Sequence, residues 1–403
     1  MKIKPYIKRS SYFEKIKPFI NKDLIKVITG QRRVGKSYFL NQVLDFIQKD
    51  KPDCQIIYIN KELDEFSDVK GYKDLLDYVN AKCDTEKSMV YLFIDEIQDI
   101  FEFEKALRSL LAEGGYDIYI TGSNADMLSG DLSSYLGGRY IEVQIYSLSF
   151  PEFMEFHNLG KNEDTLMKYI KYGGLPYLKN LELIDNVAYE YIKSIYNTIV
   201  LKDIVARYQI RNVFLLDNLN RFLADNVGSL LSAKRISDFL KSQYLNYSPK
   251  IIINYLGFLT NSFFIYKVQR ANIQGRKIFE INKKYYFEDL GLRHSITRFT
   301  IGDINKVLEN LVYKHLVICG YQVLVGQVGN KEIDFWCEKQ SKTIYVQVAY
   351  QISDEKTQQR EFGNLIEIQD NYPKYVVTMD KISSGSYKGI EHVHIIDFLV
   401  KDL

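Results

Sequence analysis

The sequence of 403 residues has few cysteines, a single tryptophan and no long apolar run. Its cysteines, Cys54, Cys83, Cys319 and Cys337, show no CxxC spacing, which excludes a disulfide framework or zinc site and predicts buried thiols in a reducing compartment. No apolar stretch could span a bilayer, and the basic N-terminus lacks the apolar core of a signal peptide. We therefore expect a cytoplasmic protein without membrane contact.

The net charge of +2 favours no particular partner when it is averaged over the chain. The charge is unevenly distributed, because residues 231–300 hold 12 Lys and Arg against 4 Asp and Glu. This local balance of +8 leaves −6 for the remainder of the chain. If the protein binds DNA, we expect this basic region to make the contact.

Residues 30–37, GQRRVGKS, fit the P-loop pattern that binds phosphate. A predicted strand at 24–29 precedes the motif and a predicted helix at 38–44 follows it, which argues against a chance match. The glycines let backbone N–H groups surround a phosphate chain, and the helix N-terminus adds its positive dipole end. Lys36 would reach the β- and γ-phosphates, and the Ser37 hydroxyl would ligate Mg²⁺. The predicted nucleotide-binding residues are Gly30, Gln31, Arg32, Arg33, Val34, Gly35, Lys36, Ser37 and Tyr38.

The first part of the chain alternates predicted strands with helical patterns, which indicates an α/β fold with a parallel sheet covered on both faces. The pattern then becomes helical and aromatic, and it continues with two helices and a hairpin that outline a winged helix-turn-helix. A second, smaller α/β region ends the chain. The predicted domains are a P-loop core at 1–146, a helical lid at 147–226, a winged helix at 227–295 and a C-terminal domain at 296–403.

Asp95 and Glu96 end an apolar run about sixty residues after the P-loop. We expect this strand to lie beside the first strand of the sheet, where Asp95 would hold Mg²⁺ through water. Glu96 would orient and deprotonate the attacking water. The alternative is a strand end that is merely capped by two acids.

Ser123 and Asn124 follow the next predicted strand, where a polar residue can fix the attacking water or sense the γ-phosphate. The alternative is an N-cap for a helix at 125–129. Arg139 follows two glycines and is positioned like an arginine finger, in the same subunit or a neighbouring one; a surface salt bridge is the alternative. Arg32 and Arg33 either touch phosphate or pair with acids such as Glu96.

GQRRVGKS, FIDEIQ, TGSN, GGRY followed by SLSFPEF, and YGGLP together resemble the bacterial and archaeal AAA+-type ATPases related to the STAND class. The resemblance covers essentially the whole chain, including KYYFEDLGLR at 284–293 and the stretch 345–362. It implies ATP hydrolysis with ATP and Mg²⁺ as cofactors. It also implies a P-loop core, a helical segment, a winged helix and a C-terminal domain similar to PD-(D/E)xK nucleases.

A nuclease of that type needs acids on its first helix and on a strand, and an (E/Q)xK motif on the next strand. Glu309, Asp334 and Gln347 match the metal-binding positions, but Ala349 occupies the lysine position. The sequence therefore predicts the fold with weakened or absent cleavage. The alternative role for this remnant site is docking or nucleic-acid binding.

The leading hypothesis is an ATPase that switches conformation, with possible homo-oligomerisation if Arg139 acts on a neighbouring subunit. The alternatives are a DNA-binding regulator or defence component that uses ATP as a switch, and an active nuclease. Basic residues of the winged helix would give salt-dependent DNA binding, although such modules also dock proteins or present a solvated face. These residues are Lys234, Arg235, Lys241, Lys250, Arg270, Arg276 and Lys277.

Overall fold

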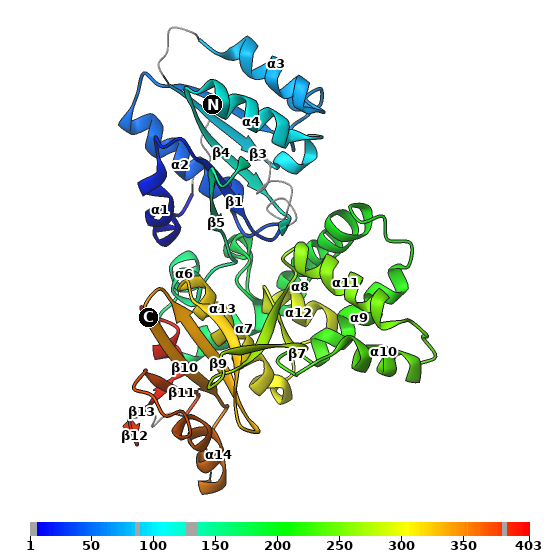
Figure 1. Ribbon diagram of the computed structural model, residues 1–403, viewed down its shortest axis with the longest axis vertical. Helices are drawn as coiled ribbons and strands as arrows, with labels where there is room; N and C mark the ends of the chain where they lie inside the picture. Colours follow the sequence, from blue (N-terminus) through cyan, green and yellow to red (C-terminus); the bar gives the residue numbers. More distant parts are fainter. Residues whose placement is uncertain (1–5, 85–88, 126–135, 353, 381–384) are drawn as a thin grey trace. The chain divides into compact units, whose positions relative to one another are not determined.

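The computed structural model describes residues 6–84, 89–125, 136–352, 354–380 and 385–403 (Figure 1). The chain forms two compact units, one of Met1–Tyr146 with Asn261–Phe263 and one of Ser147–Thr260 with Phe264–Leu403. The finer division into four domains stays a prediction. Across the described ranges, no helix combines the length and the apolar character that crossing a membrane requires.

The first unit contains the predicted parallel sheet, with five strands in the order β2-β3-β4-β1-β5. Every neighbouring pair is parallel. The expectation that the strand ending in Asp95 lies beside the first strand is wrong, because β4 stands between β3 and β1 and pairs with both. The alternation of strands and helices along a sequence does not determine the order of the strands in the sheet, because a crossover connection can place the next strand on either side of the strand before it. The strands are β1 (Ile25–Thr29), β2 (Gln55–Asn60), β3 (Val90–Asp95), β4 (Tyr116–Gly122) and β5 (Tyr140–Gln144).

Helices cover both faces of this sheet, as Figure 1 shows. Side chains of β3 point alternately to the two faces of the sheet. Leu92 and Ile94 pack in the core that includes residues of α3 and α4. Phe93 belongs to the opposite face, where its ring stacks on Tyr119 with centroids 4.7 Å apart. Burial on both faces explains why these strands read as continuous apolar runs. The helices are α1 (Ser10–Ile16), α2 (Lys36–Asp50), α3 (Tyr72–Lys82) and α4 (Phe103–Glu113).

The second unit joins helices to one mixed sheet of eight strands, in the order β12-β13-β11-β10-β9-β8-β6-β7. The predicted hairpin is present as β6 and β7, and β6 extends the C-terminal sheet by pairing in parallel with β8. The strands are β6 (Ile265–Asn272), β7 (Lys277–Phe287), β8 (Gln322–Val328), β9 (Lys331–Lys339), β10 (Lys342–Val348), β11 (Lys374–Thr378), β12 (Gly385–Tyr387) and β13 (Ile390–His394).

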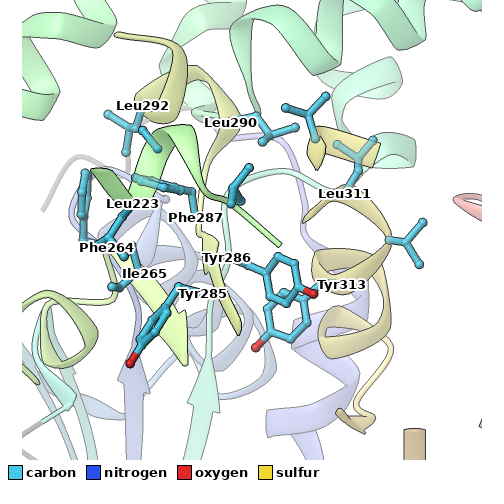
Figure 2. Close-up of a cluster of buried hydrophobic side chains, with 14 of the residues drawn as sticks. Leu223, Phe264, Ile265, Tyr285, Tyr286, Phe287, Leu290, Leu292, Leu311 and Tyr313 are labelled. Carbon is cyan, nitrogen blue, oxygen red and sulfur yellow. The ribbon is translucent and has the colours of Figure 1, made fainter. Parts of the chain in front are cut away.

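The helices of this unit include a π-helix that continues directly from α8. They are α6 (Phe150–His157), α7 (Glu163–Tyr172), α8 (Asp185–Thr198), the π-helix Ile199–Ala206, α9 (Val213–Asp225), α10 (Ala233–Ser242), α11 (Pro249–Asn261), α12 (Leu290–Thr297), α13 (Ile304–Ile318), α14 (Glu355–Ile366) and α15 (Ile395–Phe398). One apolar core unites the helices with the sheet, and Figure 2 shows part of it between β7, α12 and α13.

Two motifs that stood out in the sequence fit together inside the second unit. Gly174 N–H donates to Asp289 Oδ2 at 2.7 Å, which ties YGGLP to the turn that precedes α12. A Cβ on Gly291 would lie 2.2 Å from the Tyr172 carbonyl oxygen, so the two segments can approach only because both carry glycine at the contact. The buried Arg293 then donates to the Ala224 carbonyl at 2.9 Å and links the motif to α9.

All four cysteines are free thiols. Cys337 is buried on β9 as expected, but the other three are only partly buried. The prediction of buried thiols is wrong for those three because they lie where regular elements begin or end, next to solvent. They are Cys54 before β2, Cys83 after α3 and Cys319 after α13.

We expect Gly291→Ala to destabilise the second unit by about 1 to 3 kcal/mol, because the new methyl group must displace the backbone at Tyr172. Gly257→Ala is the matched control, since this helical glycine on α11 faces open space and alanine is the better helix former. Denaturant unfolding followed by the fluorescence of Trp336, the sole tryptophan, measures this unit specifically. Equal stability of the two variants would contradict the packing role of Gly291.

Candidate functional site

The P-loop connects the end of β1 to the start of α2, as the sequence predicts. Gly30 has φ 142°, and a Cβ there would lie 2.2 Å from the Ile145 carbonyl oxygen, so only glycine fits. Gly35 has φ 102° and precedes the first turn of α2, whose N–H groups point toward the loop. The geometry therefore provides the backbone cradle and helix N-terminus that bind phosphate.

Lys36 is only 4% exposed, and its ammonium group lies inside the loop. Lys36 Nζ donates to the carbonyl oxygens of Gly30 at 3.0 Å and Gln31 at 3.1 Å. It lies 3.8 Å from Glu96 Oε1, which brings the phosphate-binding lysine to the predicted catalytic acid. The Gln31 side chain is buried and donates to the Phe263 carbonyl at 3.2 Å.

Arg9, which the sequence analysis did not select, supports the P-loop from behind. Its guanidinium donates to the Val34 carbonyl at 3.1 Å and to the Tyr146 carbonyl at 2.8 Å. Arg9 is buried, and it also lies over the Tyr12 ring at 4.5 Å. A lone arginine before a short helix carries no motif, so only the folded structure reveals this positioning residue.

The two arginines of the loop have different surroundings. Arg32 is buried and pairs with Glu62 at 3.3 Å, and its charge also helps to lower the pKa of Glu96. Arg33 is exposed, with a left-handed φ of 70°. Tyr38 is 48% exposed on the first turn of α2.

Asp95 ends β3 at the same edge of the sheet and contacts both flanking elements. Thr121 Oγ1 donates to Asp95 Oδ1, and Ser37 also bonds the Asp95 side chain. Burial raises the pKa of Asp95, and the nearby Glu96 adds to the rise, although bonds from Thr121 and Ser37 oppose it. Ser37 and Asp95 thus present a hydroxyl and a carboxylate together, which is the oxygen donor set that Mg²⁺ prefers.

Glu96 follows Asp95 in a left-handed conformation, with φ 58°, that turns its side chain away from the strand. Burial alone would raise its pKa, but the Lys36 ammonium, the Gln98 amide, Arg32 and Ser123 outweigh burial and lower it. Glu96 therefore stays ionised, as a general base must. The neighbouring carboxylates Asp95 and Glu96 thus have pKa values that are shifted in opposite directions.

Thr121 is a further site residue that was not predicted from the sequence, where the next polar residues, Ser123 and Asn124, were predicted instead. Besides bonding Asp95, its Oγ1 accepts from the Glu96 N–H at 2.9 Å, so one hydroxyl orients both acids. Ser123 and Asn124 are buried just after β4, close to the same edge. The helix at 125–129 that they would cap in the alternative lies, apart from residue 125, outside the described residues.

Arg139 lies at the other end of the sheet. It is exposed, its Nε donates to the Leu136 carbonyl at 3.4 Å, and its own carbonyl accepts from Ile25 N–H at 3.0 Å. Ile25 begins β1, whereas the P-loop follows the end of β1. A five-residue strand spans roughly 16 Å, more than an arginine side chain can reach.

The second unit brings Glu309, Asp334 and Gln347 together, as the sequence predicts. Gln347 Oε1 accepts from the Asp334 N–H at 3.3 Å. Lys284 of β7, which begins KYYFEDLGLR but was not among the predicted site residues, joins them with its Nζ 2.6 Å from Glu309 Oε1. Burial and the neighbouring Glu309 raise the pKa of Asp334 to about 8, in spite of Lys284. No three His, Cys, Asp or Glu side chains in the described parts of the chain are arranged to hold a metal.

The basic region 231–300 exposes less charge than its composition suggests, because Lys284 and Arg293 are buried and bonded internally. Lys234, Arg235, Lys241 and Lys250 lie exposed on or beside α10 and α11, and Arg276 and Lys277 lie exposed at the hairpin turn. The Arg270 guanidinium instead stacks over the Phe279 ring at 4.7 Å.

Residues 22–154 match an AAA domain family, and residues 163–301 match a domain of unknown function, DUF8612. The chain is 37% identical to an uncharacterized protein of Haemophilus influenzae over 99% of this chain and 100% of that protein. It is 31% identical to an uncharacterized protein of Methanocaldococcus jannaschii over 82% of this chain and 75% of that protein.

Among solved structures, Cdc6p from Pyrobaculum aerophilum matches with a TM-score of 0.33 and 11% identity, covering 77% of this chain and 97% of that chain. The Aeropyrum pernix ORC1 protein in complex with DNA matches with a TM-score of 0.32 and 11% identity, covering 73% of this chain and 93% of that chain.

We expect Thr121→Val to lower the affinity for Mg²⁺-nucleotide or its turnover about 10- to 100-fold, the usual effect of losing a group that orients metal-site acids. The nearly isosteric substitution removes the bonds to Asp95 and to the Glu96 N–H but preserves the packing of β4. Thr121→Ser, which keeps the hydroxyl, is the control. A magnesium titration of both variants measures the effect, and equal loss in both would assign Thr121 a packing role.

Proposed function

Because this chain belongs to the same family as the Haemophilus influenzae and Methanocaldococcus jannaschii relatives and carries an AAA domain, we propose that it is a magnesium-dependent ATPase. In this proposal it is an AAA+-type molecular switch, related to the STAND class, that couples its nucleotide state to its second unit. The observation that carries the proposal is the meeting of Lys36, Ser37, Asp95 and Glu96 at one edge of the sheet.

Each of these residues has a distinct task in the proposed hydrolysis. Lys36 would exchange its bonds to the Gly30 and Gln31 carbonyls for phosphate oxygens, at little cost because the ammonium is already desolvated. Ser37 and Asp95 would hold Mg²⁺, which when bound neutralises phosphate charge. Glu96 would orient the attacking water and take its proton.

Ser123 and Asn124 complete the proposed site as the residues that sense the γ-phosphate. Both are buried at the loop that follows β4, and Ser123 already helps to lower the pKa of Glu96. A residue in contact with the catalytic acid is suited to reporting whether a γ-phosphate is present. Thr121 is assigned the role of orienting the acids rather than of touching substrate.

Lys36→Ala is expected to weaken ATP binding roughly a hundredfold or more, since charge-assisted hydrogen bonds contribute about 1.5 to 3 kcal/mol each. Glu96→Gln is expected to bind ATP normally while turnover falls about 10² to 10⁴-fold, because the amide cannot take a proton. Lys49→Ala on α2, at an exposed residue, and Glu102→Gln, at a half-buried residue away from the site, are the controls. Titration with a fluorescent ATP analogue and a phosphate-release assay separate the effects; unchanged turnover in both site variants would refute the assignment.

The position of Arg139 supports an active site completed by a second copy of the chain. Within one chain, Arg139 lies at the start of β5 and the P-loop at the end of β1, on opposite edges of the sheet. Its guanidinium therefore cannot reach the nucleotide of its own P-loop. We propose that Arg139 acts as an arginine finger on the γ-phosphate of a neighbouring subunit, which requires a homo-oligomer.

We expect Arg139→Ala alone and Lys36→Ala alone each to lose most turnover, with losses on the order of 10³-fold for the arginine. Mixing the two variants should restore turnover, because one subunit then supplies an intact P-loop and the other an intact Arg139. Arg108→Ala, a substitution of an exposed arginine on α4, is the control. Wild-type turnover per chain should also rise with protein concentration. If mixing the two variants restores no turnover and wild-type turnover per chain is independent of concentration, action between subunits is excluded.

A second candidate function is a DNA-binding regulator or defence component in which ATP is only a switch. The exposed Lys234, Arg235, Lys241 and Lys250 favour it, because such residues suit phosphate contacts. The exposed Ile251 and Ile253 on α11 suit a protein partner better than DNA. The two functions differ in whether duplex DNA accelerates ATP hydrolysis in a salt-dependent manner.

A further inference from the structure

Three carboxylates in the second unit surround a single ammonium group. Lys284 comes from β7, Glu309 from α13, and Glu332 and Asp334 from β9. Lys284 Nζ lies 2.6 Å from Glu309 Oε1, 2.9 Å from Glu332 Oε1 and 3.4 Å from Asp334 Oδ1. An ammonium group has three N–H donors; Lys284 donates to Glu309 and Asp334, and Glu332 lies within ion-pair distance.

Two further protein groups donate to the partly buried Glu309 and the buried Asp334. The Tyr286 hydroxyl donates to Glu309, and the Val348 N–H donates to Asp334 Oδ2 at 2.9 Å. The Lys284 side chain is only 3% exposed. The acids therefore point toward the ammonium with their protein partners in place.

A divalent cation at this position would need the same carboxylate oxygens that Lys284 contacts. Mg²⁺ and Mn²⁺ prefer sites rich in carboxylate, carbonyl and water oxygens, and a second positive charge within about 3 Å of the ammonium would be repelled. The oxygens closest to Lys284 come from three different side chains, so each of the three acids already has one oxygen paired with the ammonium. The described residues also contain no triad of His, Cys, Asp or Glu placed for a metal.

We propose that the Lys284 ammonium stands in place of a metal ion and makes this cluster a metal-free electrostatic tie between β7, α13 and β9. In this role the lysine does not replace the one expected at Ala349, which would have assisted a metal. The cluster joins the hairpin to the C-terminal segment, and its function is structural. The proposal is independent of nucleotide binding in the first unit.

The first test compares wild type with Asp334→Asn in Mn²⁺ binding, measured by the electron paramagnetic resonance of free Mn²⁺ with the full chain. We expect the same number of bound ions for both proteins, because Asp334 holds no metal while Lys284 is present. Binding to wild type that is lost in Asp334→Asn would overturn the proposal, as would Mn²⁺-dependent plasmid nicking that requires Asp334. Mn²⁺ bound at other sites contributes equally to both proteins, so it does not affect the difference between them.

The second test removes the ammonium with Lys284→Met, which preserves the length of the side chain. This variant should unfold at lower temperature than wild type in EDTA, and Mn²⁺ should raise its midpoint by roughly 3 °C or more when Trp336 fluorescence is followed. The gain should disappear in Lys284→Met/Asp334→Asn and be absent in Lys284→Arg, which keeps the positive charge. If Lys284→Met folds and Mn²⁺ does not raise its unfolding midpoint, the proposal is contradicted. If Lys284→Met does not fold, the proposal stands or falls on the first test.

Discussion

The parallel register of β1 with β4 and β5 determines what each signature residue of the first unit can reach. Val27 is level with Ile120, and Ile120 is level with Ile94, so the ends of β1, β4 and β3 meet at one edge. That alignment places the P-loop, Thr121 and Asp95 next to one another at this edge. The same register sets Ile25 beside Tyr140 and holds Arg139 at the opposite edge. One set of backbone hydrogen bonds therefore assembles the candidate nucleotide site and holds Arg139 away from the P-loop of its own chain.

Burial would raise the pKa of any carboxylate at this edge, so the difference between Asp95 and Glu96 comes from their neighbours. Asp95 receives hydroxyl donors from Thr121 and Ser37, which are too weak to offset desolvation. Glu96 turns toward the Lys36 ammonium through its left-handed backbone and stays charged. A strained φ in Glu96 thus separates the acid proposed to hold metal from the acid proposed as general base, which is a reason for such strain to persist at a functional site.

The sequence predicts the strands of the first unit and the positions of Lys36, Ser37, Asp95 and Glu96 at one edge of the sheet, because buried parallel strands and the P-loop leave local signals. It does not predict the contacts that depend on the order of the strands across the sheet. The position of β4 between β3 and β1 was missed, and with it the reach of Thr121 to Asp95. Lys284 was likewise not predicted as a site residue, since nothing in its neighbourhood along the chain marks it as the partner of Glu309, 25 residues away.

The Lys284 cluster also constrains how the second unit can respond to nucleotide. A winged helix that moved as a separate module would have to detach its hairpin from the C-terminal sheet. Such a motion would break the β6–β8 ladder and leave the Glu309, Glu332 and Asp334 carboxylates facing one another without their cation. Unpairing a buried charge costs about 3 to 5 kcal/mol, a large part of what a conformational switch has available. If hydrolysis moves the hairpin, the C-terminal sheet would therefore move with it as one rigid body. A partner bound to the hairpin or to the sheet would undergo the same displacement.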